Sequence, residues 1–558
     1  MMCNHARASL RALKMLGNMH RGLSMANWRL VFNAVCLPVL SYGCQLWANA
    51  RNWIGLINKC QKLFNEGVKV IAGAFHTAPQ EALHELTRVL PARHFFDKLT
   101  HTSALRLLRV PRTSQLLACL GPEWQVPVNG VQDLTPGGLA QPFTRPGRLR
   151  RLTQCPTALE ALAAQIPFDG QRADVVAVPP WEAPNWVGRL NYMGPTRPQN
   201  RREWVNDLYQ SIPTHNIAVL NVASLITNKG RFDDLRVGAA AALLYGSNGD
   251  TSCTFTNSWC MGTGVTQHDV DCFGLAKTAE WLNLHYTDRW APPSHVYILA
   301  RSSSALEAIR DIHSLQNQRE RILFHSSLTA FFAHHADVGI TMAWSPPSWD
   351  RIQDSTSRFR ALAACKTTPR ASLNRVQSAS HLKAIARERA FRKWAQEWQA
   401  TCRKRVGRDS FAYEYAVLRP PDGKNHPLWI AATSTTTDPV TGRRLPIFSR
   451  HTTSTALCLA VGHAFTSEYT CQFRPDLDDA GLACPCGWPD HSFYHLLYEC
   501  RLHRTARLNA NPALRWVSES PDFFLSTMPG GFVFCDFLQC SRAAFKPSNE
   551  MAVQWDPG

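Results

Sequence analysis

The chain of 558 residues is 45% hydrophobic, which excludes a disordered protein and predicts roughly two to four domains with sizeable cores. Lys and Arg outnumber Asp and Glu by 60 to 42. The resulting formal charge of +18 favours a polyanionic partner, with nucleic acid as the first candidate, and a basic but inert surface is the alternative.

Cysteine usage and the start of the chain bear on the cellular compartment. The 18 cysteines are scattered from Cys3 to Cys540 without a repeated framework. The first ten residues are polar and basic, which is not the pattern of a signal peptide. We therefore expect mostly free thiols and an intracellular location, in the nucleus or the cytoplasm, without secretion.

Residues 1–115 show apolar residues at helical spacing, which predicts helices over 8–16, 28–37 and about 54–71. The stretch 30–50 carries no formal charge over 21 residues and is long enough to cross a membrane. Polar residues and Pro38 interrupt it, so buried helices in a soluble domain explain it better. We expect no membrane partner.

Residues 116–212 have a different composition. Twelve of the 35 prolines fall between Pro122 and Pro198. Such density breaks both helices and strands, so the pattern predicts a linker, with one short helix over 158–164.

Residues 213–365 read as an α/β domain. Strands are predicted over 217–220, 237–245 and 253–259, followed by a helix over 273–284 and a strand over 295–300. Helices at 304–315 and 326–335, a strand at 338–344 and a last helix ending near 365 complete the pattern. Three strands, a helix and then alternating elements indicate a mixed sheet flanked by helices.

Residues 366–450 begin with a strongly basic segment. Between 366 and 408 twelve cations face two acids, a formal +10. Leu382, Ile385, Phe391, Trp394 and Trp398 recur mostly at steps of three and four, which predicts one long amphipathic helix with cationic remaining faces. Phosphate binding and a solvated charged face docked by its tryptophans are equally compatible with this pattern. The candidate nucleic-acid-binding residues are Lys383, Arg387, Arg392, Lys393, Arg403, Lys404 and Arg405.

Residues 451–510 contain the pattern C-x-C-x8-H-x4-C, formed by Cys484, Cys486, His495 and Cys500. Three thiols and one imidazole are donors that Zn²⁺ prefers, and a closed set of four ligands is structural rather than catalytic. Four buried residues without metal are the alternative interpretation. His463 and Cys471 are weaker candidates as spare ligands, and the tail over 511–558 is weakly patterned.

Several motifs occur in one order along the chain. They are ASLRALKMLGN at 8–18, RGL at 21–23, LPVLSYG at 37–43 with Trp47, GAFHTAP at 73–79 with EAL at 81–83, and GHAFT at 462–466 before CPCG at 484–487. This order resembles the C-terminal part of fungal-type non-LTR (LINE-like) retrotransposon polyproteins. The resemblance implies a thumb-like polymerase remnant over 1–115, a ribonuclease H-like domain over 213–365 and a CCHC zinc knuckle.

Two departures from that family bear on activity. The paired aspartates of the polymerase palm are absent from the sequence, so the resemblance implies no synthesis. Ribonuclease H enzymes hold two Mg²⁺ ions with four carboxylates. At the positions that the resemblance assigns to these acids the chain has Val222, Gly274, Arg301 and, loosely aligned, Arg358. Asp271 and Asp354 lie nearby, and Arg301 would act as a fixed cation that repels metal.

The resemblance therefore implies a degenerate retrotransposon-derived protein that binds RNA, DNA or an RNA–DNA hybrid largely independently of sequence. It favours the absence of enzymatic activity but leaves that question open. An active Mg²⁺-dependent ribonuclease that cleaves RNA–DNA hybrids, with misaligned acids, is one alternative. A relic without function is the other. The expected fold class is multidomain α/β, with a ribonuclease H-like mixed sheet, an N-terminal helical region and a small C-terminal zinc knuckle.

Overall fold

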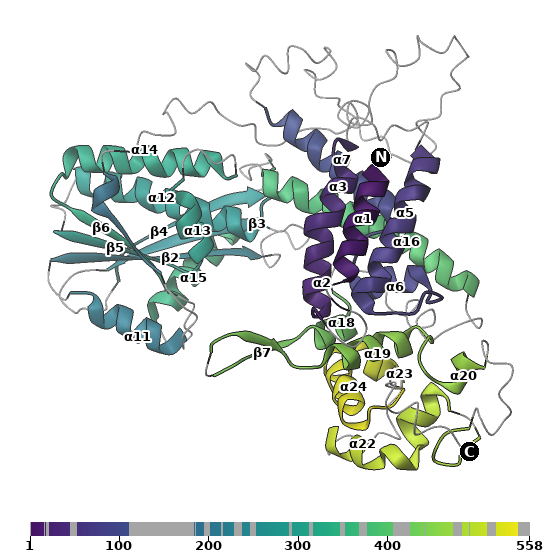
Figure 1. Ribbon diagram of the computed structural model, residues 1–558. Helices are drawn as coiled ribbons and strands as arrows, with labels where there is room; N and C mark the ends of the chain where they lie inside the picture. The colour runs from purple at the N-terminus through teal and green to yellow at the C-terminus, as the bar shows by residue number, and fades with distance from the viewer. Residues whose placement is uncertain are drawn as a thin grey trace, which may run out of the picture. The chain divides into compact units, whose positions relative to one another are not determined.

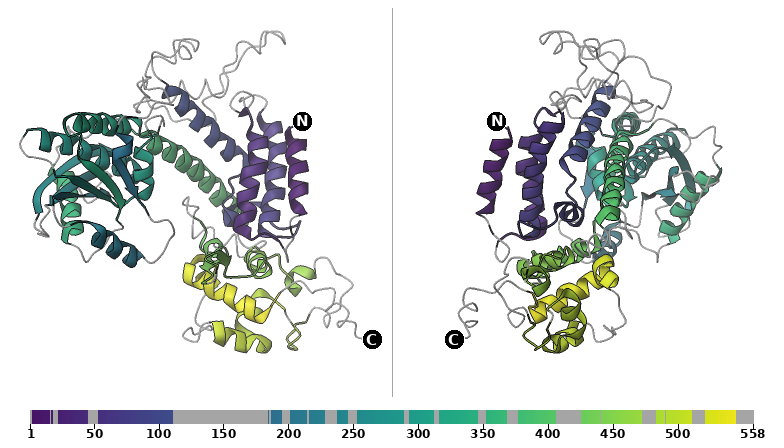
Figure 2. Two further views of the ribbon diagram at one scale, coloured as in Figure 1. Left: turned by 60° about the vertical axis from the view of Figure 1, so that its left-hand side comes forward. Right: turned by 90° about the vertical axis from the view of Figure 1, so that its right-hand side faces the viewer.

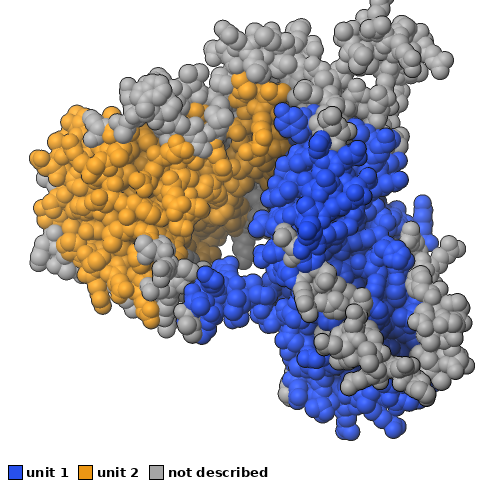
Figure 3. Space-filling view, in the orientation of Figure 1, with its two compact units in different colours: residues 1–101, 137–159, 387–558 blue, residues 102–136, 160–386 orange. Residues whose placement is uncertain are grey.

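The computed structural model describes residues 2–15, 17, 22–44, 53–110, 184, 186–194, 201–213, 216–227, 237–245, 253–288, 293–311, 316–345, 352–367, 377–405, 425–439, 441–471, 483–489, 491–510 and 521–544. The chain divides into two compact units, which Figure 3 colours separately. Unit 1 comprises Met1–His101, Gly137–Leu159 and Arg387–Gly558, and unit 2 comprises Thr102–Pro136 and Glu160–Ala386. The helix predicted over 158–164 and half of the tail, residues 511–520 and 545–558, lie outside the described residues.

Unit 2 contains one six-stranded mixed sheet in the order β1-β6-β5-β2-β3-β4 (Figure 1). Its strands are β1 (Leu190–Met193), β2 (Ile217–Thr227), β3 (Val237–Tyr245), β4 (Cys253–Thr263), β5 (His295–Ala300) and β6 (Gly339–Trp344). The pairs β2–β3 and β3–β4 are antiparallel, whereas β2–β5, β5–β6 and β1–β6 are parallel. The mixed sheet with flanking helices expected from the sequence is confirmed.

Helices cover both faces of the sheet. One face carries α12 (Gln267–Asp288), α13 (Ser303–Ile309) and α14 (Gln318–His334), which share one apolar core with β2, β5 and β6. The opposite face carries α11 (Arg201–Ser211) and α15 (Ile352–Thr367), each packed in a smaller cluster. Every residue of β3 is buried because both of its faces are covered, which explains its continuous run of small and apolar residues.

Several elements of unit 2 have other bounds than the sequence predicts, among them α12, α13 and α14, and two differences change the sheet itself. The predicted linker over 116–212 contains strand β1 and helix α11, and β1 adds an edge strand parallel to β6. A strand of four residues has too little periodic signal to stand out between prolines. Strand β2 continues to Thr227, seven residues beyond its predicted end, because its last residues still pair with β3 as far as Val237.

Unit 1 begins with α1 (Met2–Lys14), then α2 (Met25–Val31), η1 (Phe32–Cys36) and α3 (Leu37–Ser41), which follow one another without a break, and then α5 (Trp53–Ala72). These helical runs lie side by side in Figure 2. The one-turn π-helix η1 leads directly into α3, where Pro38 occupies the first turn. A proline ring clashes with the carbonyl four residues earlier, and the wider π turn relieves that clash. Helices α6 (Gln80–Thr87) and α7 (Ala92–Leu108) follow.

The C-terminal part of unit 1 packs into the same core as these N-terminal helices. It contains α16 (Ala379–Arg405, in unit 1 from Arg387), α18 (Pro427–Ala432), the hairpin β7 (Thr435–Thr437) and β8 (Arg444–Pro446), α19 (Arg450–Ala460), α20 (Ser467–Thr470), η5 (His495–Glu499), η6 (Arg501–His503), α22 (Arg504–Ala510), α23 (Pro521–Ser526) and α24 (Met528–Ser541). One apolar cluster joins residues from Ala6 to Phe96 with residues from Ala390 to Ala544.

Two polar contacts fix this joint core at the end of α5. The buried guanidinium of Arg450 donates to the carbonyls of Ile71, at 2.7 Å, and Val70, at 2.8 Å, and so caps the C-terminus of α5. The run 73–79 packs on the run 462–469, with the Phe75 ring edge-on to Phe465 at 4.9 Å. Two of the motifs that carry the resemblance are thus in direct contact with each other.

Among the described residues, no helix combines the length and the apolarity that a membrane crossing requires.

Candidate functional site

The first predicted site lies where β2 and β5 run parallel in unit 2. Val222 on β2 is paired in register with Ala300, the last residue of β5, and Arg301 follows directly. Val222 is buried in the core beneath α12. The indole nitrogen of Trp344 donates to the carbonyl of Arg301 at 3.0 Å and holds this loop against β6. The sequence thus places an aliphatic and a cationic side chain at neighbouring positions of the sheet.

Arg301 contacts Asp354 in the first turn of α15. The guanidinium donates to the Asp354 carbonyl at 3.1 Å and lies 3.8 Å from its carboxylate. The same carboxylate accepts a hydrogen bond of 2.9 Å from the side-chain amide of Asn221. Asp354 is buried, and the amide and the guanidinium offset the cost of removing its carboxylate from bulk water.

Asp271 approaches the same region from helix α12. Its carboxylate accepts hydrogen bonds from the hydroxyl of Ser224 and, at 2.8 Å, from the side-chain amide of Gln267. Burial lowers the pKa of Arg301. The negative charges of Asp354 and Asp271 oppose that shift, whereas the positive charge of Arg358 adds to it. Arg301 is therefore within electrostatic reach of both acids, and Arg358 places a second positive charge nearby.

Gly274 occupies a packing position. A Cβ atom there would lie 2.9 Å from the Cβ of Ala240 and 3.3 Å from Cγ1 of Val222. The glycine therefore lets α12 approach β2 and β3 closely, and the core has no room for a carboxylate at this position. Asp271, one turn earlier on α12, is the residue that carries an acid to this region.

The predicted basic helix is α16, which packs through the apolar edge expected from the sequence. Phe391, Trp394 and Trp398 are buried in the core of unit 1, and Leu382 is buried in unit 2. Ile385 differs from its predicted role because it is 39% exposed. Trp394 and Trp398 are packing residues and are not available for stacking with bases.

The cationic residues of α16 have different environments. Arg387, Arg392, Arg403 and Lys404 are exposed, Lys383 and Lys393 are half-buried, and the side chain of Arg405 lies outside the described residues. Arg392 pairs with Glu388 at 2.7 Å, and both partners are so exposed that the pair contributes little stability. Lys393 lies 3.4 Å from Asp97 of α7. The predicted residues are therefore brought together on one helix, most of them facing solvent.

Helix α7 adds the cation Lys98 beside α16. In unit 1, burial and the neighbouring Arg387 lower the pKa of Lys98. Burial, Arg389 and Lys393 lower the pKa of His101 to about 4, against the opposing effect of Asp97. His101 is therefore uncharged at neutral pH, and Lys98 lies within electrostatic reach of Arg387. This contribution of α7 is not visible in the sequence, because it depends on how the two helices pack.

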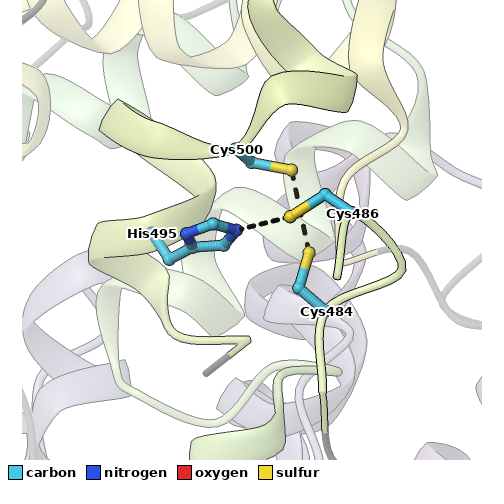
Figure 4. Close-up of side chains that lie close together, drawn as sticks. All are labelled: Cys484, Cys486, His495 and Cys500. Atoms are coloured by element: carbon cyan, nitrogen blue, oxygen red, sulfur yellow. Dashed lines mark hydrogen bonds between the residues drawn. The ribbon is translucent and has the colours of Figure 1, made fainter. Parts of the chain in front are cut away.

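The second predicted site is a compact group of four side chains in unit 1, shown in Figure 4. The ligand atoms of Cys484, Cys486, His495 and Cys500 all lie within 4.8 Å of one another. The Sγ atoms of Cys484 and Cys500 are 3.7 Å apart, and Cys486 Sγ is 3.2 Å from His495 Nε2. Two thiolates bound tetrahedrally to Zn²⁺ at about 2.3 Å lie about 3.8 Å apart. The donor set and its spacing are compatible with Zn²⁺.

The backbone explains how four residues within seventeen converge. Gly487 has a φ of +87°, and a hydrogen bond of 2.8 Å from its N–H to the Cys484 carbonyl closes the turn that brings Cys484 and Cys486 together. His495–Glu499 forms a π turn, closed by a hydrogen bond of 2.8 Å from the Cys500 N–H to the His495 carbonyl. Residues five apart share one side of a π turn, so His495 and Cys500 point the same way.

Neighbouring side chains orient this group. Glu499 lies 3.4 Å from Nδ1 of His495, which leaves Nε2 directed at the cysteines. Arg507 donates to the carbonyls of Cys500, at 2.7 Å, and Leu496, at 3.2 Å. Burial raises the pKa of Cys486, but hydrogen bonds with the Trp488 backbone, Cys484, His495 and Cys500 outweigh burial and lower it to about 7. The sequence analysis missed Glu499, Arg507 and Trp488, which the H-x4-C spacing alone does not indicate.

The two spare ligand candidates lie apart from this group. Among the described residues, the only group of three or more His, Cys, Asp or Glu residues that is placed so that it could hold a metal ion contains neither His463 nor Cys471. His463 is tilted against Tyr469, with ring centroids 4.7 Å apart, and lies 3.4 Å from the Thr77 hydroxyl. Cys471 is exposed. His463 therefore serves packing.

Comparisons with known proteins add little to this description. The chain matches no protein-family model and no curated protein. Its solved structural neighbours include RNase H1 from the halophilic archaeon Halobacterium salinarum NRC-1, at 12% identity over 26% of this chain and 96% of that chain, with a TM-score of 0.20. The PFV RNase H domain matches at 9% identity over 28% and 94% of the two chains, also with a TM-score of 0.20.

A third neighbour is the foamy viral protease-reverse transcriptase in complex with an RNA/DNA hybrid, at 11% identity, with a TM-score of 0.21. That match covers 28% of this chain and 20% of the viral chain, so it spans about a fifth of the viral protein. At such TM-scores and identities these likenesses establish neither a fold nor a function. The sheet is therefore described by its own topology.

Proposed function

We propose that this protein binds nucleic acid through the cationic face of α16 and does not hydrolyse it. The observation that carries this proposal is that α16 buries its aromatic edge while Arg387, Arg392, Arg403 and Lys404 remain exposed. Burial of Trp394 and Trp398 fixes the helix to unit 1, so the outward charges are presented on a rigid element. Rigid arrays of guanidinium and ammonium groups bind phosphates and release condensed counterions, independently of base sequence.

The α/β unit supports the non-hydrolytic part of the proposal. Its order of strands and helices is the one that the resemblance to a ribonuclease H-like domain implies, with β2 as the first strand and β5 as the fourth. A two-metal site needs several carboxylates to offset the charge of two Mg²⁺ ions. Here Val222 and Arg301 take two of the acid positions, and Arg301 is paired with one of the two remaining acids, Asp354. A fixed guanidinium beside these acids would repel a metal ion.

The Cys484, Cys486, His495 and Cys500 group is proposed to hold one structural Zn²⁺. All four donors belong to the protein, which closes the coordination shell and leaves no open position for a substrate or water. Bound zinc would tie the 484–488 turn to the π turn at 495–499. The proposed domain assignment is a retrotransposon-derived chain with a polymerase remnant, a ribonuclease H-like unit and this zinc knuckle.

The binding proposal is tested by fluorescence anisotropy with a labelled RNA–DNA hybrid, duplex DNA and single-stranded RNA over a range of salt concentrations. The triple variant R387Q/R392Q/R403Q is compared with R11Q/K59Q/R443Q, which removes three exposed cations elsewhere in unit 1. On duplex DNA we expect the α16 variant to reduce the slope of log K against log salt by about 2 to 3, because each phosphate contact contributes roughly 0.9. Equal losses in the two variants would show diffuse charge attraction, and no binding by the wild type at low salt would end the proposal.

Cleavage of RNA–DNA hybrids is a second candidate function, and one observation favours it. Asp271 and Asp354 approach from opposite faces of the sheet and both act on Arg301. The test is incubation of a hybrid labelled in its RNA strand with Mg²⁺ or Mn²⁺, comparing the wild type with D271N and D354N. We expect an intact RNA strand in every sample. Cleavage that both variants abolish would establish the ribonuclease instead.

A further inference from the structure

Two thiols outside the four-residue Cys/His group face each other in the N-terminal part of unit 1. Cys3 lies on α1 and Cys60 on α5, and both are free thiols. They are 57 residues apart in the sequence, yet their Sγ atoms lie 3.8 Å apart. A disulfide bond is about 2.05 Å long, so an approach of about 1.8 Å would join them. The two sulfur atoms are therefore close enough to react with each other.

The helical spacing of both segments brings these thiols together. Cys3 precedes Ala6 and Leu10 at steps of three and four, on the side of α1 that packs into the core of unit 1. Cys60 precedes Phe64 by one turn on the corresponding side of α5. A thiol also packs as a small apolar side chain, so two cysteines that serve only the core are the simpler alternative. Chemical reactivity is what separates the two interpretations.

The two thiols differ in accessibility, which gives them different roles in a reaction. Cys3 is only partly buried, whereas Cys60 is 1% exposed. Burial raises the pKa of Cys60 to about 12, and the adjacent Cys3 adds to that shift. The thiolate is the reactive form of cysteine, and a reagent from solution must also reach it. Cys3 is therefore the thiol that an external oxidant meets first, and Cys60 can react only with a group held at Cys3.

We propose that Cys3 and Cys60 form a reversible disulfide that links α1 to α5, with a low-molecular-weight disulfide such as oxidised glutathione as the oxidant. The Cys3 thiolate attacks one sulfur of the oxidant, which forms a mixed disulfide and releases one thiolate. Cys60 then loses its proton and attacks Cys3 Sγ, which closes the protein disulfide and releases the second thiolate. Two protein thiols are oxidised, one small disulfide is reduced to two thiols, and the two protons from the protein end on those thiols.

Contact between the two sulfur atoms favours the second step. The attack of Cys60 is intramolecular, and this proximity offsets the small fraction of Cys60 that is ionised. The disulfide would close a loop that contains α2, η1 and α3, and so would restrict the unfolded chain. A polar contact between the same two helices, Lys14 with Glu66 at 2.6 Å, is partly exposed and contributes little. The redox state would thus set how firmly α1 is held, independently of the proposed nucleic-acid binding.

The test incubates the reduced, full-length, zinc-loaded protein with oxidised glutathione and maps disulfides by mass spectrometry of unreduced peptides. We expect two peptides joined through Cys3 and Cys60, and their separation after a reductant is added. The melting temperature of the oxidised protein should exceed that of the reduced protein by about 5 °C or more. Cys60→Ala should stop the reaction at the mixed disulfide on Cys3, and Cys3→Ala should leave Cys60 unmodified.

Controls separate this bond from general thiol oxidation. Cys471→Ser removes an exposed thiol elsewhere in unit 1 and should give the same cross-link and the same rise in melting temperature. Zinc content before and after oxidation shows whether the thiols of the Cys/His group have reacted. If Cys3 of the wild type stops at the mixed disulfide, or if both thiols stay unmodified while Cys471 reacts, the two cysteines serve only packing and the proposal is wrong. Should the alanine variants fail to fold, the disulfide map of the wild type decides alone.

Discussion

At the scale of single residues, the proposal that Arg301 and the missing acids prevent metal binding can be tested by restoring carboxylates to the site. Val222→Asp with Arg301→Asp would place two new carboxylates near Asp271 and Asp354. We expect the double variant to be less stable than the wild type without metal, because Val222 is buried, and to be stabilised by Mg²⁺. At Mg²⁺ about tenfold above its Kd the gain is about 1.4 kcal/mol, or roughly 2–4 °C in the melting temperature.

The matched control for that experiment is Val222→Asn with Arg301→Asn, which changes the same side chains without adding carboxylates. Its melting temperature should not respond to Mg²⁺, and neither should that of the wild type. Adding D354N to the acidic double variant should remove the response. If the wild type itself gains several degrees from Mg²⁺, Arg301 does not repel metal and the interpretation of this site is wrong.

The cysteine group allows a second test at the scale of single residues. Cys500→Ser removes one of four ligands and should reduce bound zinc from about one equivalent to a small fraction, because a structural site depends on its complete thiolate set. Cys471→Ser removes an exposed thiol outside the group and should retain full zinc content. Metal analysis of both purified variants checks this. A loss of zinc in the Cys471 variant would place that thiol in the shell after all.

At the scale of elements, most strands and helices of the α/β unit could be predicted from the sequence, but the edge strand β1 could not. Strands β3 and β5 were predicted from end to end, since each is a continuous apolar run between polar segments. Strand β1 was missed because four residues among prolines carry too little signal. The Cys/His group was predicted as a set because ligand chemistry depends on residue type and spacing. Gly274 was assigned to an acid position because only the fold shows that α12 packs against β2 and β3 there.

The contact of α6 with α5 leads to a prediction on pH. His84 of α6 is buried, lies 2.7 Å from the carbonyl of Val89 through Nδ1, and is within 3.0 Å of Gln61 and Asn65 through Nε2. Burial lowers the pKa of His84 from its ordinary 6.5 to about 4. The unfolded chain therefore takes up the proton first as the pH falls. The resulting stability is fully present above pH 6.5 and is lost as the pH falls towards 4, by about 3 kcal/mol.

Chemical denaturation at a series of pH values measures this effect. His84→Gln should lower stability at neutral pH, where it disturbs the polar contacts, and should flatten the decline between pH 6.5 and 4. His76→Gln, at an exposed position, should leave the slope unchanged. An unchanged slope in the His84 variant would mean that other groups carry the pH dependence, and His101 and His503, whose pKa values burial also lowers to about 4, would be the next to test.

At the scale of the whole molecule, the sequence could not show which distant segments share a core. The N-terminal helices and the C-terminal segment meet in one apolar cluster, and Arg450 caps a helix that ends nearly four hundred residues earlier. Contacts between segments so far apart in the sequence produce no local periodic pattern. Each segment taken alone shows an apolar face but not the segment that covers it. The motifs that carry the resemblance all lie in unit 1, and two of them, 73–79 and 462–466, contact each other through Phe75 and Phe465.

This shared core leads to a prediction on metal removal. The four proposed ligands and the η5 turn belong to unit 1, as do the elements packed against them. The Phe493 ring lies 5.9 Å from the Phe534 ring of α24, and Arg507 of α22 donates a hydrogen bond to the Cys500 carbonyl. Chelation should therefore speed hydrogen exchange over 484–510 first and then over α24, as the support for this edge of the core weakens.

Strands β2, β3 and β5 of unit 2 serve as the internal control, because none of the proposed ligands lies in unit 2. Exchange measured by mass spectrometry with and without chelator gives the answer, and readdition of zinc should restore protection. Equal acceleration in the unit 2 strands, or none over 484–510, would contradict a structural metal at this site.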